Sequence, residues 1–95
     1  MKKSKEIAVV VTTSHRGVFF GYTSDWSGDT VKLRAGRMCT YWSAAMKGVF
    51  GLASIGPDKN CRIGTACDLE LRNVTAVAQC SKQATAAWEA QPWKV

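Results

Sequence analysis

Two apolar segments near the start of the chain predict a β-hairpin. Residues 6–13 are almost continuously apolar and rich in β-branched side chains, which favours a strand covered on both faces. Residues 18–23 form a second such segment, and the short polar segment 14–17 between them is typical of a tight connection. Residues 24–29 are rich in Gly, Ser and Asp and predict a turn with Trp26 at its tip.

Apolar and polar residues alternate most cleanly in residues 30–35. The apolar members share one face and the basic members the other: Val31, Leu33 and Ala35 against Lys32 and Arg34. This pattern predicts a half-exposed antiparallel strand with a basic outer face. We expect Gly36 to break the strand, after which residues 37–42 continue in extended form.

The next part of the chain predicts shorter elements. Residues 43–47 are compatible with one helical turn, and the glycines and the proline within residues 48–57 indicate turns or loop. Residues 61–64 predict a short strand. Residues 68–79 predict one further strand, in which Asn73 marks a bulge because the apolar positions change phase there.

One helix is expected at the C-terminal end. Ser81 is a good N-cap, the Ala-rich segment 82–90 places apolar residues at helical spacing, and Pro92 ends it. The predicted fold class is therefore α+β and mainly β. We expect a small curved antiparallel sheet or open barrel of about five strands with a C-terminal helix packed on it. Residues 1–95 form a single domain, with residues 1–5 as a disordered basic tail.

The size and charge of the chain restrict its partners. A chain of 95 residues buries a thin core, so we expect it to pair with copies of itself as a homo-oligomer. The net charge of +6 favours an anionic partner, although charges of about 2 to 8 also serve solubility in small domains. The longest apolar run, residues 7–11, is far shorter than the roughly 20 residues of a membrane span. We expect a cytoplasmic protein with no membrane partner.

The cysteines do not form a recognisable metal or redox motif. They stand at Cys39, Cys61, Cys67 and Cys80, without a Cys-x-x-Cys pair, and the single histidine, His15, is distant in sequence. We therefore predict no metal site and no cofactor. Their number would allow a disulfide framework, but without a secretion signal we expect free thiols that are buried or half-buried.

A run of basic and aromatic residues is the main candidate for function: Lys32, Arg34, Arg37, Tyr41 and Trp42. Guanidinium groups hold phosphates through paired hydrogen bonds, and aromatic faces stack on bases. The same composition fits a solvated basic face over core aromatics, because basic residues commonly protect strand edges. His15 and Arg16, in the predicted turn, either contact a phosphate, lie at an interface or are ordinary exposed turn residues.

Other features point away from catalysis. The chain has no nucleophile motif, and its acidic residues are too scattered for a paired-carboxylate mechanism or a divalent metal site. The glycines of residues 48–56 lack the Lys-Ser/Thr ending of a phosphate-binding loop. Trp26 is either an exposed contact residue or folds back onto the domain, whereas Trp88 is expected in the core and Trp93 at the C-terminus. We expect a binding protein rather than an enzyme.

Three segments of the sequence resemble a known group of proteins. They are residues 7–22 (Ile-Ala-Val-Val-Val-Thr-Thr-Ser-His-Arg-Gly-Val-Phe-Phe-Gly-Tyr), residues 37–43 (Arg-Met-Cys-Thr-Tyr-Trp-Ser) and residues 48–53 (Gly-Val-Phe-Gly-Leu-Ala). Together they look like an uncharacterised family of small proteins encoded by bacteriophages and prophages. The resemblance implies context and no chemistry. Small phage proteins are often inhibitors of host defence: some block CRISPR effectors, and others sequester cyclic-nucleotide immune signals.

These observations lead to one hypothesis with open alternatives. We expect a homo-oligomeric phage-type protein that counters host defence by sequestering an anionic nucleotide-type ligand without turnover. The residues expected to bind the ligand are His15, Arg16, Arg34, Arg37, Tyr41 and Trp42. The alternatives are an anti-CRISPR or other protein-binding inhibitor of a host effector, and a small nucleic-acid-binding module whose affinity falls steeply with salt. An enzyme acting on a nucleotide signal fits least well.

Overall fold

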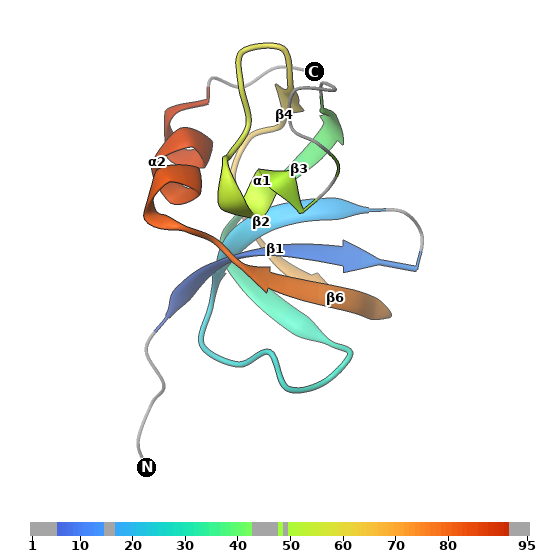
Figure 1. The fold of residues 1–95 in the computed structure, drawn as a ribbon. Coiled ribbons are helices and arrows are strands. Elements are labelled where there is room, and N and C mark those ends of the chain that lie inside the picture. Colours follow the sequence, from blue (N-terminus) through green and yellow to red (C-terminus); the bar gives the residue numbers. More distant parts are fainter. Residues whose placement is uncertain (1–5, 15–16, 43–47, 49, 92–95) are drawn as a thin grey trace.

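A mainly β architecture with a C-terminal helix is seen in the computed structural model, which describes residues 6–14, 17–42, 48 and 50–91 (Figure 1). Its strands are β1 (Ile7–Thr13), β2 (Val18–Thr23), β3 (Val31–Tyr41), β4 (Arg62–Ile63), β5 (Cys67–Leu71) and β6 (Val74–Gln79). The helices are α1 (Gly51–Ser54) and α2 (Lys82–Ala90). The six strands form one open antiparallel sheet, which confirms the predicted fold class. No helix of the described residues is long and apolar enough to cross a membrane.

β1 lies inside the sheet and is covered on both faces. It pairs with β2 on one side and with β6 on the other. Val9, Val10 and Val11 have no exposed surface, although neighbours along a strand point to opposite faces. This confirms the prediction made from the continuous apolar run. The hairpin of β1 and β2 is also confirmed, with Val10 opposite Phe20.

The two faces of the sheet carry separate apolar clusters. The cluster beneath the helices comprises Val10, Val18, Phe20, Cys39, Leu52, Ala53, Cys61, Ile63, Ala84 and Trp88. The cluster on the other face, enclosed by the curvature of the sheet, comprises Val9, Val11, Val31, Leu33 and Leu71. The fold is therefore a curved sheet with one face turned inward and the other covered by α1 and α2.

β3 is longer than expected because Gly36 does not interrupt it. The strand bulges at Ala35, whose φ of 53° lies in the left-handed region, and the ladder continues to Tyr41. Phe20 pairs with Arg37 and Tyr22 with Arg34, so two residues of β3 stand opposite one residue of β2. On its other side β3 pairs first with β5 and then with β4.

Residues 68–79 form two strands, which corrects the prediction of one bulged strand. Asn73 adopts a φ of 59°, and the chain turns there from β5, beside β3, to β6, beside β1. β5 and β6 therefore stand at opposite edges of the sheet although two residues join them. Asn tolerates the left-handed region because its side chain is short and polar. The change of phase of the apolar positions at Asn73 therefore marks a turn between two strands and not a bulge within one.

Both helices pack on the same face of the sheet (Figure 1). α2 begins as predicted, with the Ser81 hydroxyl accepting a hydrogen bond from Ala84 N at 3.0 Å. Trp88 is fully buried, as expected, stacks on Phe20 with ring centroids 4.9 Å apart, and donates from Nε1 to Leu52 O. α1 lies where only turns were expected. The predicted helical turn at residues 43–47 and the predicted position of Trp93 lie outside the described residues.

Candidate functional site

The bulge in β3 determines which basic side chains come together. Without it, Arg34 and Arg37 would point to opposite faces of the sheet, because they are three residues apart. The extra residue at the bulge returns both to the helix-covered face, opposite Tyr22 and Phe20 of β2. Ala35 N–H donates to Asp68 Oδ1 at 3.0 Å, which ties the bulge to β5.

The two arginines line a hollow between the sheet and α2, which we call the arginine pocket. It has a volume of about 520 Å³ and is lined by Phe20, Tyr22, Arg34, Ala35, Arg37, Thr65, Ala66 and Glu89. Strand β2 supplies the aromatic residues, β3 the arginines, the segment between β4 and β5 supplies Thr65 and Ala66, and α2 supplies Glu89. The volume lies in the range of about 300–1,000 Å³ typical of small-molecule sites.

Arg37 is the buried cation of this pocket. Its exposed fraction is only 8%, which corrects the expectation of a surface residue on a basic outer face. Nε donates to Gly64 O at 2.7 Å, and Nη1 donates to Trp88 O and Gln91 O at 2.8 and 2.9 Å. These last two carbonyls lie at the C-terminal end of α2, where a cation is favoured by the helix dipole. Burial lowers the pKa of Arg37.

The contacts of Arg37 leave one edge of its guanidinium group available. No hydrogen bond to another described residue uses Nη2, which carries two N–H donors. No ion pair to a carboxylate of the described residues involves Arg37 either. The side chain is thus fixed in orientation by three carbonyls, while no carboxylate of the described residues pairs with its charge. A donor group held in this way is suited to an anionic ligand.

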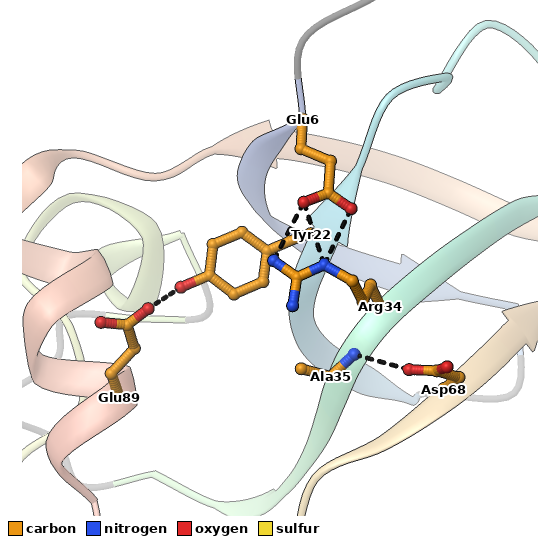
Figure 2. A network of polar contacts seen from close by, with 6 residues as sticks. All are labelled: Glu6, Tyr22, Arg34, Ala35, Asp68 and Glu89. Carbon is orange, nitrogen blue, oxygen red and sulfur yellow. Dashed lines mark hydrogen bonds and ion pairs between the residues drawn. The ribbon is translucent and has the colours of Figure 1, made fainter.

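Arg34 is the exposed cation of the pocket, and its position is shown in Figure 2. Its guanidinium carbon lies 4.8 Å from the centre of the Tyr22 ring, within cation–π distance. Nε donates to both carboxylate oxygens of Glu6, at 3.0 and 2.9 Å, and Nη2 lies 2.9 Å from Oε1. The hydrogen bond from Arg34 lowers the pKa of Glu6. Because both groups are exposed, water screens this pair, and a ligand can compete for the arginine.

Tyr22 connects the arginines to α2. Its hydroxyl donates to Glu89 Oε2, as Figure 2 shows. Burial and then the hydrogen bond to Glu89 raise the pKa of Tyr22 to about 12. The hydroxyl is therefore a proton donor at neutral pH and is fully engaged by Glu89. Glu89 is the only acidic residue that lines the arginine pocket among the described residues.

The hollow on the other side of Arg34 has the opposite electrostatic character. It has a volume of about 730 Å³, and its charged residues are Glu6, Asp25, Lys32, Arg34, Asp68 and Glu70. Acids outnumber bases there, and Glu70 stands directly opposite Lys32 on the neighbouring strand. The predicted basic outer face of β3 is therefore balanced by acids, which corrects the picture of an uncompensated basic strand. Sequence reasoning missed this because these acids come from three separate segments.

The same balance holds for the described part of the chain as a whole. Seven of the 13 Lys and Arg residues are described, and they equal the seven Asp and Glu residues, all of which are described. The net charge of +6 thus comes from basic residues outside the described ranges. The described part of the chain therefore has no excess of basic over acidic residues.

The structure brings together two of the six predicted ligand-binding residues. Arg34 and Arg37 share the arginine pocket, whereas Tyr41 and Trp42 do not line it. Tyr41 is half exposed at the end of β3, and Trp42 packs against the cluster beneath the helices. His15 and Arg16 lie outside the described residues. The lining residues that the sequence did not indicate are Phe20, Tyr22, Ala35, Thr65, Ala66 and Glu89.

Trp26 and the four cysteines are the remaining candidates from the sequence. Trp26, at the tip of the β2–β3 turn, has an exposed fraction of 43%, so the turn does not bury it. All four cysteines are free. Three match the expectation of buried or half-buried thiols, namely Cys39, Cys61 and Cys80, whereas Cys67 at the start of β5 is exposed. Burial raises the pKa of Cys39 to about 11 and that of Cys80 to about 12.

Comparison with known proteins assigns a family without a known activity. No curated protein and no solved structure matches the chain. One family model, described as a domain of unknown function (DUF6948), matches residues 6–88, which span the sheet and most of α2. The chain therefore belongs to the DUF6948 family.

Proposed function

We propose that this protein is a binding protein that holds an anionic, nucleotide-type ligand in the arginine pocket without turnover. The observation that carries the proposal is the pair of guanidinium groups on one face of β3, of which one is buried and fixed. Arg37 has a defined orientation, a charge that no described carboxylate pairs with, and two N–H donors that no described residue uses. Arg34 lies on the same pocket and is exposed.

The two arginines would hold an anion in different ways. Arg37 supplies a donor edge that is already ordered, so binding costs little side-chain entropy there. Arg34 supplies a second guanidinium that exchanges Glu6 for the ligand's anionic group. Planar guanidinium groups match phosphate oxygens in paired hydrogen bonds, which a lysine cannot provide. Thr65, from the segment between β4 and β5, adds a hydroxyl that can donate or accept.

The charge distribution supports an anion in this pocket rather than in the neighbouring hollow. The arginine pocket contains two arginines and one carboxylate, and that carboxylate accepts the Tyr22 hydroxyl. The neighbouring hollow contains more acids than bases and would repel phosphate. An anionic ligand would therefore be attracted to the arginine pocket and not to the hollow on the other side of Arg34.

Binding without turnover is supported by the chemistry of the lining residues. Catalysis of phosphoryl or acyl transfer by a side chain needs a nucleophile beside a base. The described lining offers two hydroxyls, those of Thr65 and Tyr22, and one carboxylate, that of Glu89, which accepts the Tyr22 hydroxyl. The resemblance of the sequence to phage-encoded proteins extends the proposal to its biological use. In a host cell, such a protein would remove a signalling nucleotide by sequestration.

The test is calorimetric titration with a panel of linear and cyclic nucleotides, using one variant and one matched control. Arg34→Gln removes a guanidinium from the pocket. We expect its affinity to fall about 10- to 100-fold, because charge-assisted hydrogen bonds contribute about 1.5–3 kcal/mol. Arg72→Gln removes the same charge and another exposed ion pair, that of Arg72 with Glu70, away from the pocket, and should change affinity less than about twofold.

The outcomes separate the proposal from its alternatives. Equal weakening by both variants would show that net charge, and not the pocket, attracts the ligand. Binding that grows with the length of a nucleic acid and falls steeply with salt would indicate a nucleic-acid-binding module. A folded protein that binds no nucleotide at all would overturn sequestration and favour an inhibitor that docks on a host protein.

A further inference from the structure

The outer edge of β6 presents backbone groups that β1 does not use. Cys80 N–H donates to Ala8 O at 2.8 Å, and Val9 stands opposite Gln79. In an antiparallel ladder, successive residues direct their N–H and C=O groups alternately toward and away from the partner. The backbone groups of Val77 and Gln79 therefore point away from β1.

Little of the described chain covers this edge. Among the described residues, β6 makes one backbone hydrogen bond outside its pairing with β1, from Val74 N to Asp29 O at 2.9 Å. That contact covers only the first residue of the strand, because Asp29 belongs to the β2–β3 turn. Unpaired strand edges of this kind are templates for another strand.

The edge of β6 also lacks the charges that protect the other edges of the sheet. Residues 74–81 contain no charged residue and no proline. β5 carries Asp68 and Glu70, and β4 carries Arg62. Charged side chains on an edge strand disfavour pairing with another chain, so β5 and β4 are protected while β6 is not.

Apolar side chains at the two edges of the open sheet remain only half-buried. Val74 and Val77 of β6 and Leu69 of β5 pack against the inward-facing cluster but are not covered completely. A strand added beside β6 would cover the two valines while it satisfies the backbone groups of Val77 and Gln79. One added strand would therefore provide both hydrophobic burial and backbone hydrogen bonds.

We propose that the partner is a second copy of this chain, which pairs its own β6 antiparallel with this edge. The partner strand must be extended, uncharged and open on one side. β6 is extended and uncharged, and beyond Val74 no described segment pairs with its outer side. In a two-fold arrangement each copy supplies the same residues, so one surface is complementary to itself. Val77 of each copy lies opposite Gln79 of the other, which places Ala78 on the two-fold axis.

The test is the subunit mass of the full chain in solution, measured by sedimentation equilibrium from micromolar to near-millimolar concentration. We expect a reversible dimer. Gln79→Lys places a cation on the edge of each copy, and we expect it to raise the dissociation constant at least about tenfold. Gln83→Lys makes the same chemical change on the exposed surface of α2 and should leave the dissociation constant within about twofold.

A measurement on the unsubstituted protein keeps the test decisive if the lysine variant does not fold. The amide hydrogens of Val77 and Gln79 should exchange with solvent more slowly as protein concentration rises, because only the dimer protects them. A monomer at every concentration would overturn the proposal. So would a dimer whose stability Gln79→Lys does not change, or one in which these two amides stay unprotected.

Discussion

Replacing Arg37 by Lys tests whether the buried guanidinium group fixes α2 to the sheet. The native side chain donates from two nitrogen atoms to three carbonyl oxygens, those of Gly64, Trp88 and Gln91. A lysine keeps the positive charge but has a single nitrogen, so it loses one or two of these bonds. Hydrogen bonds that involve a charged group contribute about 1.5–3 kcal/mol each, so the loss of one or two of them gives an expected destabilisation of about 1.5–6 kcal/mol.

The loss is measurable because a small domain has a total stability of about 5–15 kcal/mol. The assay is urea unfolding followed by tryptophan fluorescence, to which the buried Trp88, next to the substituted side chain, contributes together with the other three tryptophans. We expect a lower midpoint with an unchanged slope. Arg72→Lys, at an exposed arginine, is the control and should shift stability by less than about 0.5 kcal/mol. An equally small shift for Arg37→Lys would refute the buried, fixed position of Arg37.

Three further predictions concern the fold and its titratable groups. Gly56→Ala should lower stability by about 2–4 kcal/mol, because Gly56 has a φ of 91° and a Cβ would lie 2.6 Å from that of Ala87. Gly28→Ala is the control in the same unfolding assay, because a Cβ at Gly28 would have no heavy atom within 4 Å beyond its chain neighbours. Absorbance titration of the folded protein should show a tyrosine that ionises near pH 12, and Tyr22→Phe should remove this transition. Because this pKa lies above the ordinary 10.0, the unfolded chain loses the proton at lower pH than the folded protein. The stability that Tyr22 contributes is therefore complete below pH 10 and lost as the pH rises toward 12. In native protein a thiol reagent should modify Cys67 rapidly and the buried thiols only on unfolding, so Cys67→Ser should abolish the fast phase; a fast phase that persists in this variant would contradict the assigned burial.

Local sequence patterns are sufficient to predict the strands in which burial follows a simple pattern along the chain. The continuous apolar run of β1 and the alternation at the start of β3 each depend on neighbouring residues only, and the structure has both strands. The N-cap of α2 is equally local, because the Ser81 hydroxyl bonds the backbone three residues later. Such features are encoded within a few residues and need no knowledge of distant contacts.

The candidate site was predictable only in part because it depends on a bulge and on distant partners. Arg34 and Arg37 could be singled out by their side-chain chemistry. The bulge at Ala35, which places them on one face, is indicated in the sequence only by the neighbouring Gly36. Glu6 is 28 residues away from Arg34, so no local pattern links them. α1 was missed for a similar reason, since its four residues are held by packing of Leu52 against the core rather than by helix propensity.

Native mass spectrometry can show whether the arginine pocket holds an anionic nucleotide-type ligand without chemical change. The protein, purified from a bacterial host, is measured before and after addition of linear and cyclic nucleotides. We predict a discrete added mass, with one nucleotide for each arginine pocket, that is released unchanged on denaturation. A folded protein that takes up none of these nucleotides, or one that releases them with altered mass, would contradict the account.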